Sequence, residues 1–151
     1  MTPLMSFWPD VYNRILKSEK LFEYRRVFPK NCTHAFMYVS SPVKAICGII
    51  YFEEVYKLSD LIDSCDEVIS DRINRYLPKY QYAGSIKAVQ RIKPIHLEEL
   101  KLNLPNFTAP QSYLYIDNYP ELKDFLLKNV KFDGQKISNS IDILSLNHIC
   151  S

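Results

Sequence analysis

The sequence predicts a single α+β domain, and three observations lead to this prediction. The chain has 151 residues, about the length of one domain, and 47% of them are hydrophobic, enough for a sizeable core. Its 11 tyrosines and 8 phenylalanines favour strands that pack through aromatic side chains. Short apolar runs of strand length and segments with helical spacing both occur along the chain.

The first elements are predicted to be a strand, a helix and a highly charged strand. Leu4 to Phe7 is a short apolar run, and Pro9 suits the first position of a helix that extends to Lys17. Leu21 to Val27 follows, and in an extended chain successive side chains point to opposite faces. Glu23 and Arg25 then share one face. Because buried charges are costly unless they are paired, this arrangement indicates either a structural ion pair or a site for a polar ligand.

The rest of the chain predicts further strands and helices. Gly48 lies inside a long strand and indicates a bulge or a close backbone approach. Ile95 to Leu104 gives only a weak signal, and apolar residues become sparse after position 132. We therefore predict one domain at residues 1–132 and a tail of uncertain order at residues 133–151. The other expected strands are Ala35–Val39, Lys44–Leu58 and about Ser85–Ile92. The other expected helical segments are Ser59–Leu77, as one helix or two, and Tyr119–Val130.

Charge and cysteine content narrow the function classes. The net charge is only +2, but residues 1–30 carry six Lys/Arg against three Asp/Glu, and residues 76–101 carry five against two. This segregation indicates either one basic face that binds nucleic acid, or solvated segments that face different ways. The four cysteines and three histidines have no metal-ligand spacing, so no metal and no cofactor is predicted. Without a signal peptide or a long apolar run, we expect a cytoplasmic protein with reduced thiols and no membrane partner.

Three motifs, in this order, resemble the ASCH family of the PUA-like superfamily across roughly Met5 to Phe125. They are the helix-to-strand passage Ile15–Arg25, the segment Tyr38–Gly48, and Pro110-Gln111-Ser112-Tyr113. The resemblance implies a small mixed β-barrel flanked by helices. One departure is Ser18, which stands where the family commonly has glycine, so that the turn need not be left-handed here.

The resemblance also implies a ligand-binding cleft. In it, Lys20, Glu23 and Arg25 face the Ser40-Ser41 turn, and Gln111 and Ser112 complete the site. Superfamily members use such clefts for RNA or for modified nucleobases, and this donor and acceptor set suits both. Bases can stack on aromatic side chains, and the candidate platforms are Tyr24, Tyr80 and Tyr82, for which packing in the core or at its rim is the alternative.

Enzymatic and non-enzymatic functions both stay open at this point. Some ASCH relatives are amidohydrolases on acylated cytidine, which would make Lys20 the catalytic amine and put Glu23 where they have a threonine nucleophile. A carboxylate cannot replace that hydroxyl, and Glu23 should hold Lys20 protonated. With Gly48, Gly84 and Gly134 as the only glycines, no glycine-rich phosphate loop is present.

The main prediction for the function is an RNA-binding or modified-nucleotide-binding module that uses a basic cleft. The alternative is an enzyme, either a small amidohydrolase on acylated nucleosides or a metal-independent ribonuclease. The third possibility is a protein-interaction module. Ligand identity and oligomeric state are left open.

Overall fold

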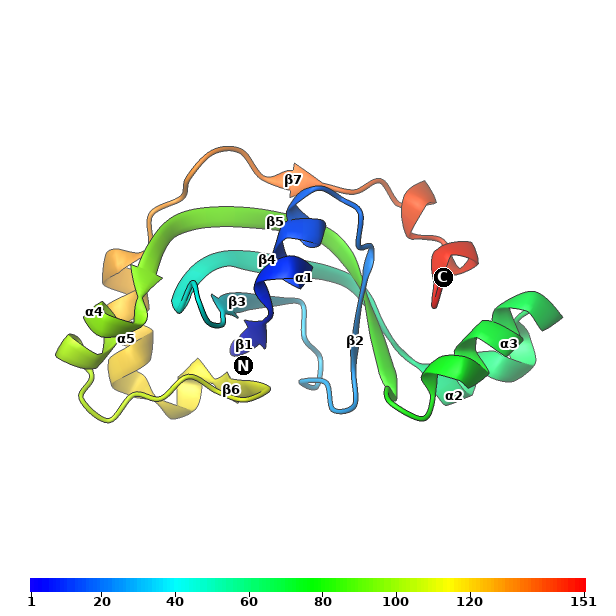
Figure 1. Ribbon diagram of the computed structural model, residues 1–151, viewed down its shortest axis with the longest axis horizontal. Coiled ribbons are helices and arrows are strands. Elements are labelled where there is room, and N and C mark those ends of the chain that lie inside the picture. The colour runs from blue at the N-terminus through cyan, green and yellow to red at the C-terminus, as the bar shows by residue number, and fades with distance from the viewer.

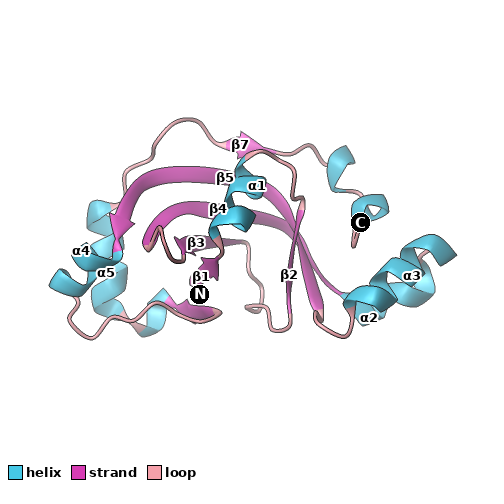
Figure 2. Cartoon of the chain, in the orientation of Figure 1, coloured by secondary structure: helices cyan, strands magenta, loops and turns pink.

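A computed structural model describes all 151 residues as a curled, half-barrel sheet with helices at both ends and one helix in front (Figures 1 and 2). The α+β prediction is confirmed. The strands are β1 (Pro3–Phe7), β2 (Phe22–Arg25), β3 (His34–Val39), β4 (Ala45–Lys57), β5 (Tyr82–His96), β6 (Tyr113–Tyr115) and β7 (Ile137–Ser138). The helices are α1 (Pro9–Leu16), α2 (Leu58–Leu61), α3 (Glu67–Tyr76), α4 (Leu97–Asn103) and α5 (Pro120–Asn129).

The sheet is mixed, and its two longest strands give it the half-barrel shape. The strand order is β2-β5-β4-β3-β1-β6, and β7 pairs with β5. Only β1 and β3 are parallel to each other. Register shifts between β4 and β5 at Ile46/Gly48 and at Tyr51 to Val55 mark bulges, which bend and twist strands. The irregularity predicted at Gly48 is present, and a Cβ added there would lie 2.9 Å from the Gln90 carbonyl oxygen.

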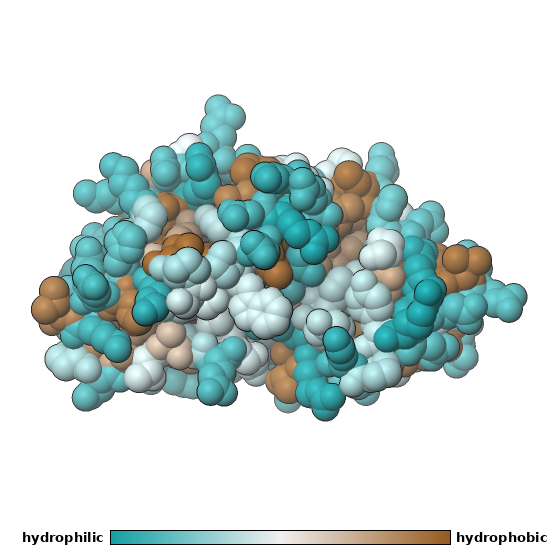
Figure 3. Space-filling model, viewed as in Figure 1, coloured by the Kyte–Doolittle hydropathy of each residue, from teal (hydrophilic) through white to brown (hydrophobic).

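Three apolar clusters hold these layers together. The largest fills the concave side of the sheet, where Tyr12 and Ile15 of α1 pack against Ile50, Phe52 and Ile86 of β4 and β5. A second cluster lies under α4 and α5, and a third lies between the sheet, α2 and α3. On the face of the molecule that Figure 3 shows, hydrophobic residues appear only as separate patches. The fold therefore buries many large apolar side chains, and the residues of the edge strand β2 are themselves buried or half-buried.

The structure decides two segments that the sequence left open. The segment Ser59–Leu77, expected as one helix or two, contains two α-helices, because Cys65 is extended and Asp66 caps a new helix by accepting a hydrogen bond from the Ile69 N–H at 2.9 Å. Residues Leu97–Asn103, where the sequence signal was weak, form α4. This helix is short and mainly Leu100 is buried in it, so its apolar periodicity is too brief to detect.

The C-terminal segment, whose order the sequence left open, packs against the rest of the chain. It contributes β7 and two short 3₁₀ helices, Asp142–Leu144 and Leu146–His148. Ile149 and Cys150 are buried in the third apolar cluster. The chain thus returns to the end of the molecule that holds α3 (Figure 1). None of its helices is both long enough and apolar enough to cross a bilayer.

Candidate functional site

The turn after α1 positions Lys20 at the start of the charged strand. Ser18 has φ of +55°, so the turn is left-handed although serine replaces glycine. The N–H groups of Glu19 and Lys20 both donate to the Arg14 carbonyl oxygen, at 2.9 and 3.2 Å. These bonds close the helix end and direct the chain into β2.

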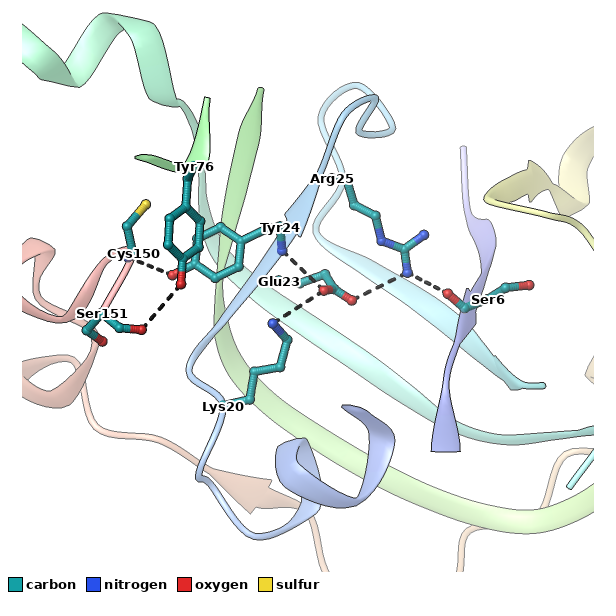
Figure 4. Close-up of polar contacts among 8 residues, drawn as sticks. All are labelled: Ser6, Lys20, Glu23, Tyr24, Arg25, Tyr76, Cys150 and Ser151. Carbon is teal, nitrogen blue, oxygen red and sulfur yellow. Dashed lines mark hydrogen bonds and ion pairs between the residues drawn. The ribbon is translucent and has the colours of Figure 1, made fainter. Parts of the chain in front are cut away.

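Glu23 lies between two cations on one face of β2 (Figure 4). Its Oε1 is 3.7 Å from Lys20 Nζ, and its Oε2 is 3.4 Å from Arg25 Nη2. The three side chains are only 7–14% exposed. The ion pair between Glu23 and Arg25, one of the two possibilities that the alternation left open, is therefore present, and Lys20 extends it into a triad. The three side chains are mostly buried. Because burial removes water from their charges, each charge needs its oppositely charged partner to offset the cost.

Arg25 links this triad to the neighbouring strands. Its Nη2 donates to the Ser6 carbonyl oxygen at 2.6 Å, and its Nη1 donates to the Ser112 carbonyl oxygen at 3.3 Å. Its guanidinium also lies over the Phe7 ring, 4.9 Å from the ring centroid. Arg25 thereby connects β2, at one end of the strand order, to β1 and to the segment before β6, which lie at the other end.

Burial changes the acid–base behaviour of Lys20. Desolvation lowers the pKa of the Lys20 ammonium below its ordinary value, Glu23 opposes this change, and Arg14 adds to it. The expectation that Glu23 favours the protonated form of Lys20 has the direction of the Glu23 effect right, since Glu23 raises the pKa of Lys20. It considered the neighbouring charge but not the removal of water, which is the larger effect. A lysine with a lowered pKa is a more available proton acceptor.

The other face of β2 carries a cluster of tyrosines. The Tyr24 ring lies 4.8 Å from Tyr76 and 5.9 Å from Tyr80, centroid to centroid, and Lys20 Nζ is 4.8 Å from the Tyr24 centroid. The Tyr24 hydroxyl accepts a hydrogen bond from the Cys150 N–H at 2.7 Å (Figure 4). Burial raises the pKa of both Tyr24 and Tyr76, so both phenols stay neutral at physiological pH.

A pocket of about 620 Å³ opens beside this cluster, between the end of α1, β2, α3 and the C-terminal segment. We call it the basic pocket. Four cationic side chains and one acidic side chain line it, together with three tyrosines. Its lining is Arg14, Glu19, Lys20, Leu21, Phe22, Tyr24, Arg75, Tyr76, Lys79, Tyr80, His148 and Ser151.

The structure distributes the predicted site residues between two pockets. Lys20 lines the basic pocket, whereas Ser40, Ser41 and Gln111 line a smaller pocket of about 330 Å³. Ser6 also lines this smaller pocket, and its carbonyl oxygen is the one that accepts from Arg25. The triad thus lies between the two pockets, and the Ser112 backbone contacts it directly. Among the proposed stacking platforms, Tyr24 and Tyr80 line the basic pocket, and Tyr82 packs against the large apolar cluster.

Much of the lining of the basic pocket was not predicted from the sequence. Arg75, Tyr76 and Lys79 were not among the candidates, and they come from α3 and the turn after it, together with the predicted platform Tyr80. Their i, i+1, i+4, i+5 spacing would have placed two cations and two tyrosines on one helical face, but Pro78 suggested that the helix ends between them. Arg14 gave no signal, because it contributes only after the chain turns at Ser18.

Comparison with known proteins finds relatives that are similar to this chain in sequence or in fold. No protein-family model matches the chain. It is 29% identical over 128 residues to an ASCH domain-containing ribonuclease of Zymomonas mobilis, covering 75% of this chain and 82% of the relative. The crystal structure of the ASCH protein from Zymomonas mobilis is similar at a TM-score of 0.64 and 24% identity, covering 86% of this chain and 96% of the other. A point variant of that protein gives a TM-score of 0.63 at 23% identity, with the same coverage. The resemblance predicted from the sequence is confirmed: the chain is similar in sequence to an ASCH domain-containing ribonuclease and has the same fold as the ASCH structures.

Proposed function

We propose that the chain binds single-stranded RNA in the basic pocket. The observation that carries this proposal is the pairing of four cationic side chains with three tyrosine rings around one cavity. Single-stranded nucleic acids are bound in this way, with cations along the phosphates and bases stacked on aromatic rings at about 1–3 kcal/mol per base. The ribonuclease named in the comparison gives RNA further support as the ligand class.

The charge triad supplies the polar half of this site. Lys20 lines the pocket and is held by Glu23, which is held in turn by Arg25. A side chain fixed in this way loses little conformational freedom when it contacts a phosphate or a carbonyl group. The volume of about 620 Å³ is in the range of small-molecule sites, so a free modified nucleoside is the other ligand to test.

RNA binding should be weak and sensitive to salt. Each phosphate contact to a single strand contributes a slope of about −0.7 to the dependence of log affinity on log salt concentration. We expect Lys79→Ala to weaken binding and to reduce the slope by about that amount. Lys101→Ala, an equal charge change at an exposed position on α4, should change neither value. Fluorescence anisotropy with a labelled single strand at several salt concentrations measures both values.

Binding that does not vary with salt would contradict this proposal. It would point to an uncharged nucleoside or to a protein partner. A slope that Lys79→Ala and Lys101→Ala reduce equally would show that RNA contacts the surface at large and not the basic pocket.

Metal-independent RNA cleavage is a second candidate function, favoured by the lowered pKa of Lys20. Neutral Lys20 would accept the proton of a ribose 2′-hydroxyl, and the 2′-oxygen would attack the adjacent phosphorus. The bond from phosphorus to the 5′-oxygen breaks, and water returns a proton to the leaving oxygen. Arg14 and Arg75 line the same pocket and would stabilise the charge on the phosphate in the transition state.

Cleavage by this route should depend on Lys20 and should increase with pH. The neutral fraction of Lys20 grows as pH rises toward its lowered pKa, so the rate should rise over that range. Lys20→Ala should abolish product formation, while Lys17→Ala, an exposed lysine outside the pocket, should keep it. Electrophoresis of an RNA incubated with each variant and a metal chelator measures this. Equal cleavage by wild type and Lys20→Ala would exclude Lys20 as the base.

A further inference from the structure

A second pocket, also about 620 Å³, lies where β3, β4, β5 and β7 meet, and it shares no lining residue with the basic pocket. We call it the Tyr51 pocket. Most of its lining side chains carry hydrogen-bonding groups. They are Thr33, His34, Tyr51, Phe52, Glu53, Lys87, Ala88, Lys136, Ser138 and Asn139.

The Tyr51 ring has an aromatic and a cationic neighbour in this pocket. The His34 ring lies 6.1 Å from it, centroid to centroid, at an interplanar angle of 29°. Lys136 Nζ lies 4.2 Å from the Tyr51 centroid. The Thr33 hydroxyl is hydrogen-bonded to His34 Nδ1 at 3.0 Å, which fixes the imidazole beside the phenol.

The sheet register brings these groups together. His34 and Tyr51 are direct partners across β3 and β4, and Tyr51 is paired with Ala88 across β4 and β5. Ala88 is paired in turn with Ser138 of β7, which places Lys136 next to the ring. In Figure 1, β7 is a short arrow beside β5, reached by a long connection from α5. Four strands therefore build one aromatic and cationic site.

The two lysines of this pocket differ in their partners. Lys87 pairs with Glu53 at 3.6 Å, whereas Lys136 has no carboxylate within 4.0 Å, and its ammonium lies over the Tyr51 ring. The Asn139 amide group donates to the Ile86 carbonyl oxygen at 2.8 Å, so its own oxygen remains an acceptor. The pocket thus combines an unneutralised cation, an aromatic platform and a free amide oxygen.

We propose that the Tyr51 pocket is a second binding site, which takes a nucleoside phosphate. The base stacks against Tyr51 and His34, and the phosphate binds Lys136. Replacing the contact between Lys136 and the Tyr51 ring by a stacked base is favourable, because a base stacked on an aromatic side chain contributes more than an exposed cation–π contact. The nucleoside phosphate is either a free mononucleotide or one nucleotide of an RNA strand. This proposal does not depend on RNA binding in the basic pocket.

Titration of the protein with adenosine 5′-monophosphate, followed by NMR chemical shifts, tests the site. We expect shifts at Tyr51 and Lys136, with affinity weakened about fivefold or more by Tyr51→Leu and by Lys136→Ala. Tyr51→Phe keeps the ring and should retain binding, and Lys79→Ala in the basic pocket should leave these shifts unchanged. Adenosine and inorganic phosphate, each supplying half of the ligand, should bind more weakly than the nucleotide.

The same variants distinguish the two sources of the nucleotide. If an RNA strand supplies it, a single strand should shift Tyr51 at lower concentration than adenosine 5′-monophosphate does, and Lys136→Ala should weaken binding of both. If a mononucleotide is the ligand, Lys136→Ala should weaken binding of the nucleotide and leave the affinity for the strand unchanged. The proposal is overturned if neither ligand shifts Tyr51, or if Lys136→Ala lowers thermal stability while every affinity stays the same. In that case Lys136 only holds β7 against the sheet.

Discussion

Glu23→Gln is expected to lower the free energy of unfolding by about 3–5 kcal/mol, the usual cost of removing one partner from a buried ionic cluster. Glutamine keeps the size of the side chain and can still accept from the Tyr24 N–H, which Glu23 Oε1 does at 3.1 Å. Lys20 and Arg25 would both lose their shared counter-charge while their side chains stay mostly buried. The loss of stability therefore measures the removal of the Glu23 charge and not a change in side-chain volume.

Urea denaturation of the two proteins measures this difference. Glu19→Gln is the matched control, because Glu19 is exposed on the same turn and forms none of the ion pairs. We expect the control to change stability by less than about 0.5 kcal/mol. A Glu23→Gln protein as stable as the control would show that the triad adds nothing to folding.

Gly84→Ala is expected to destabilise the fold by about 2–3 kcal/mol, toward the upper end of the range for overpacking a core. Gly84 is paired with Glu23 across β2 and β5, directly beneath the triad. A Cβ at this position would lie 2.8 Å from Phe28 Cζ and 2.9 Å from Phe52 Cδ1. Both rings are buried and pack edge to face at 5.1 Å, so neither can move without disturbing the other.

A second substitution separates this steric effect from a general loss of strand stability. Phe52→Leu removes the ring atoms nearest to the new methyl group, so the double variant should recover part of the stability that Gly84→Ala loses. Thermal or urea denaturation of the single and double variants gives this coupling energy. Strictly additive losses would mean that the clash with Phe52 is not the cause.

The sequence predicted most of the secondary structure, because its apolar spacing directly reflects which face each element buries. The helix at Pro9, the alternation at Glu23 and Arg25, and the irregularity at Gly48 are local features, and the structure has them. α4 was missed because its buried side is too short to leave a period. Residues Ile149 and Cys150 were placed in a tail of uncertain order, since only the folded chain brings them to the cluster around α3.

The candidate site was predictable only in part, for a related reason. Lys20, Glu23 and Arg25 lie close in sequence, so their interaction follows from strand geometry. The partners of Arg25, by contrast, are backbone carbonyl groups of Ser6 and Ser112, and no residue type indicates them. The lowered pKa of Lys20 depends on its burial in the folded chain, and the lining of the basic pocket combines segments from the beginning, the middle and the end of the sequence.

NMR chemical-shift mapping with a short single-stranded RNA tests most directly whether the basic pocket is the RNA-binding site. The predicted result is that the largest shifts occur around Lys20, Tyr76 and Lys79, and that they disappear as salt is raised. Tyr80→Ala, which removes a stacking platform, should weaken the same shifts. Shifts confined to α5 or the opposite face of the sheet, or no shifts at low salt, would contradict the assignment of RNA binding to this pocket.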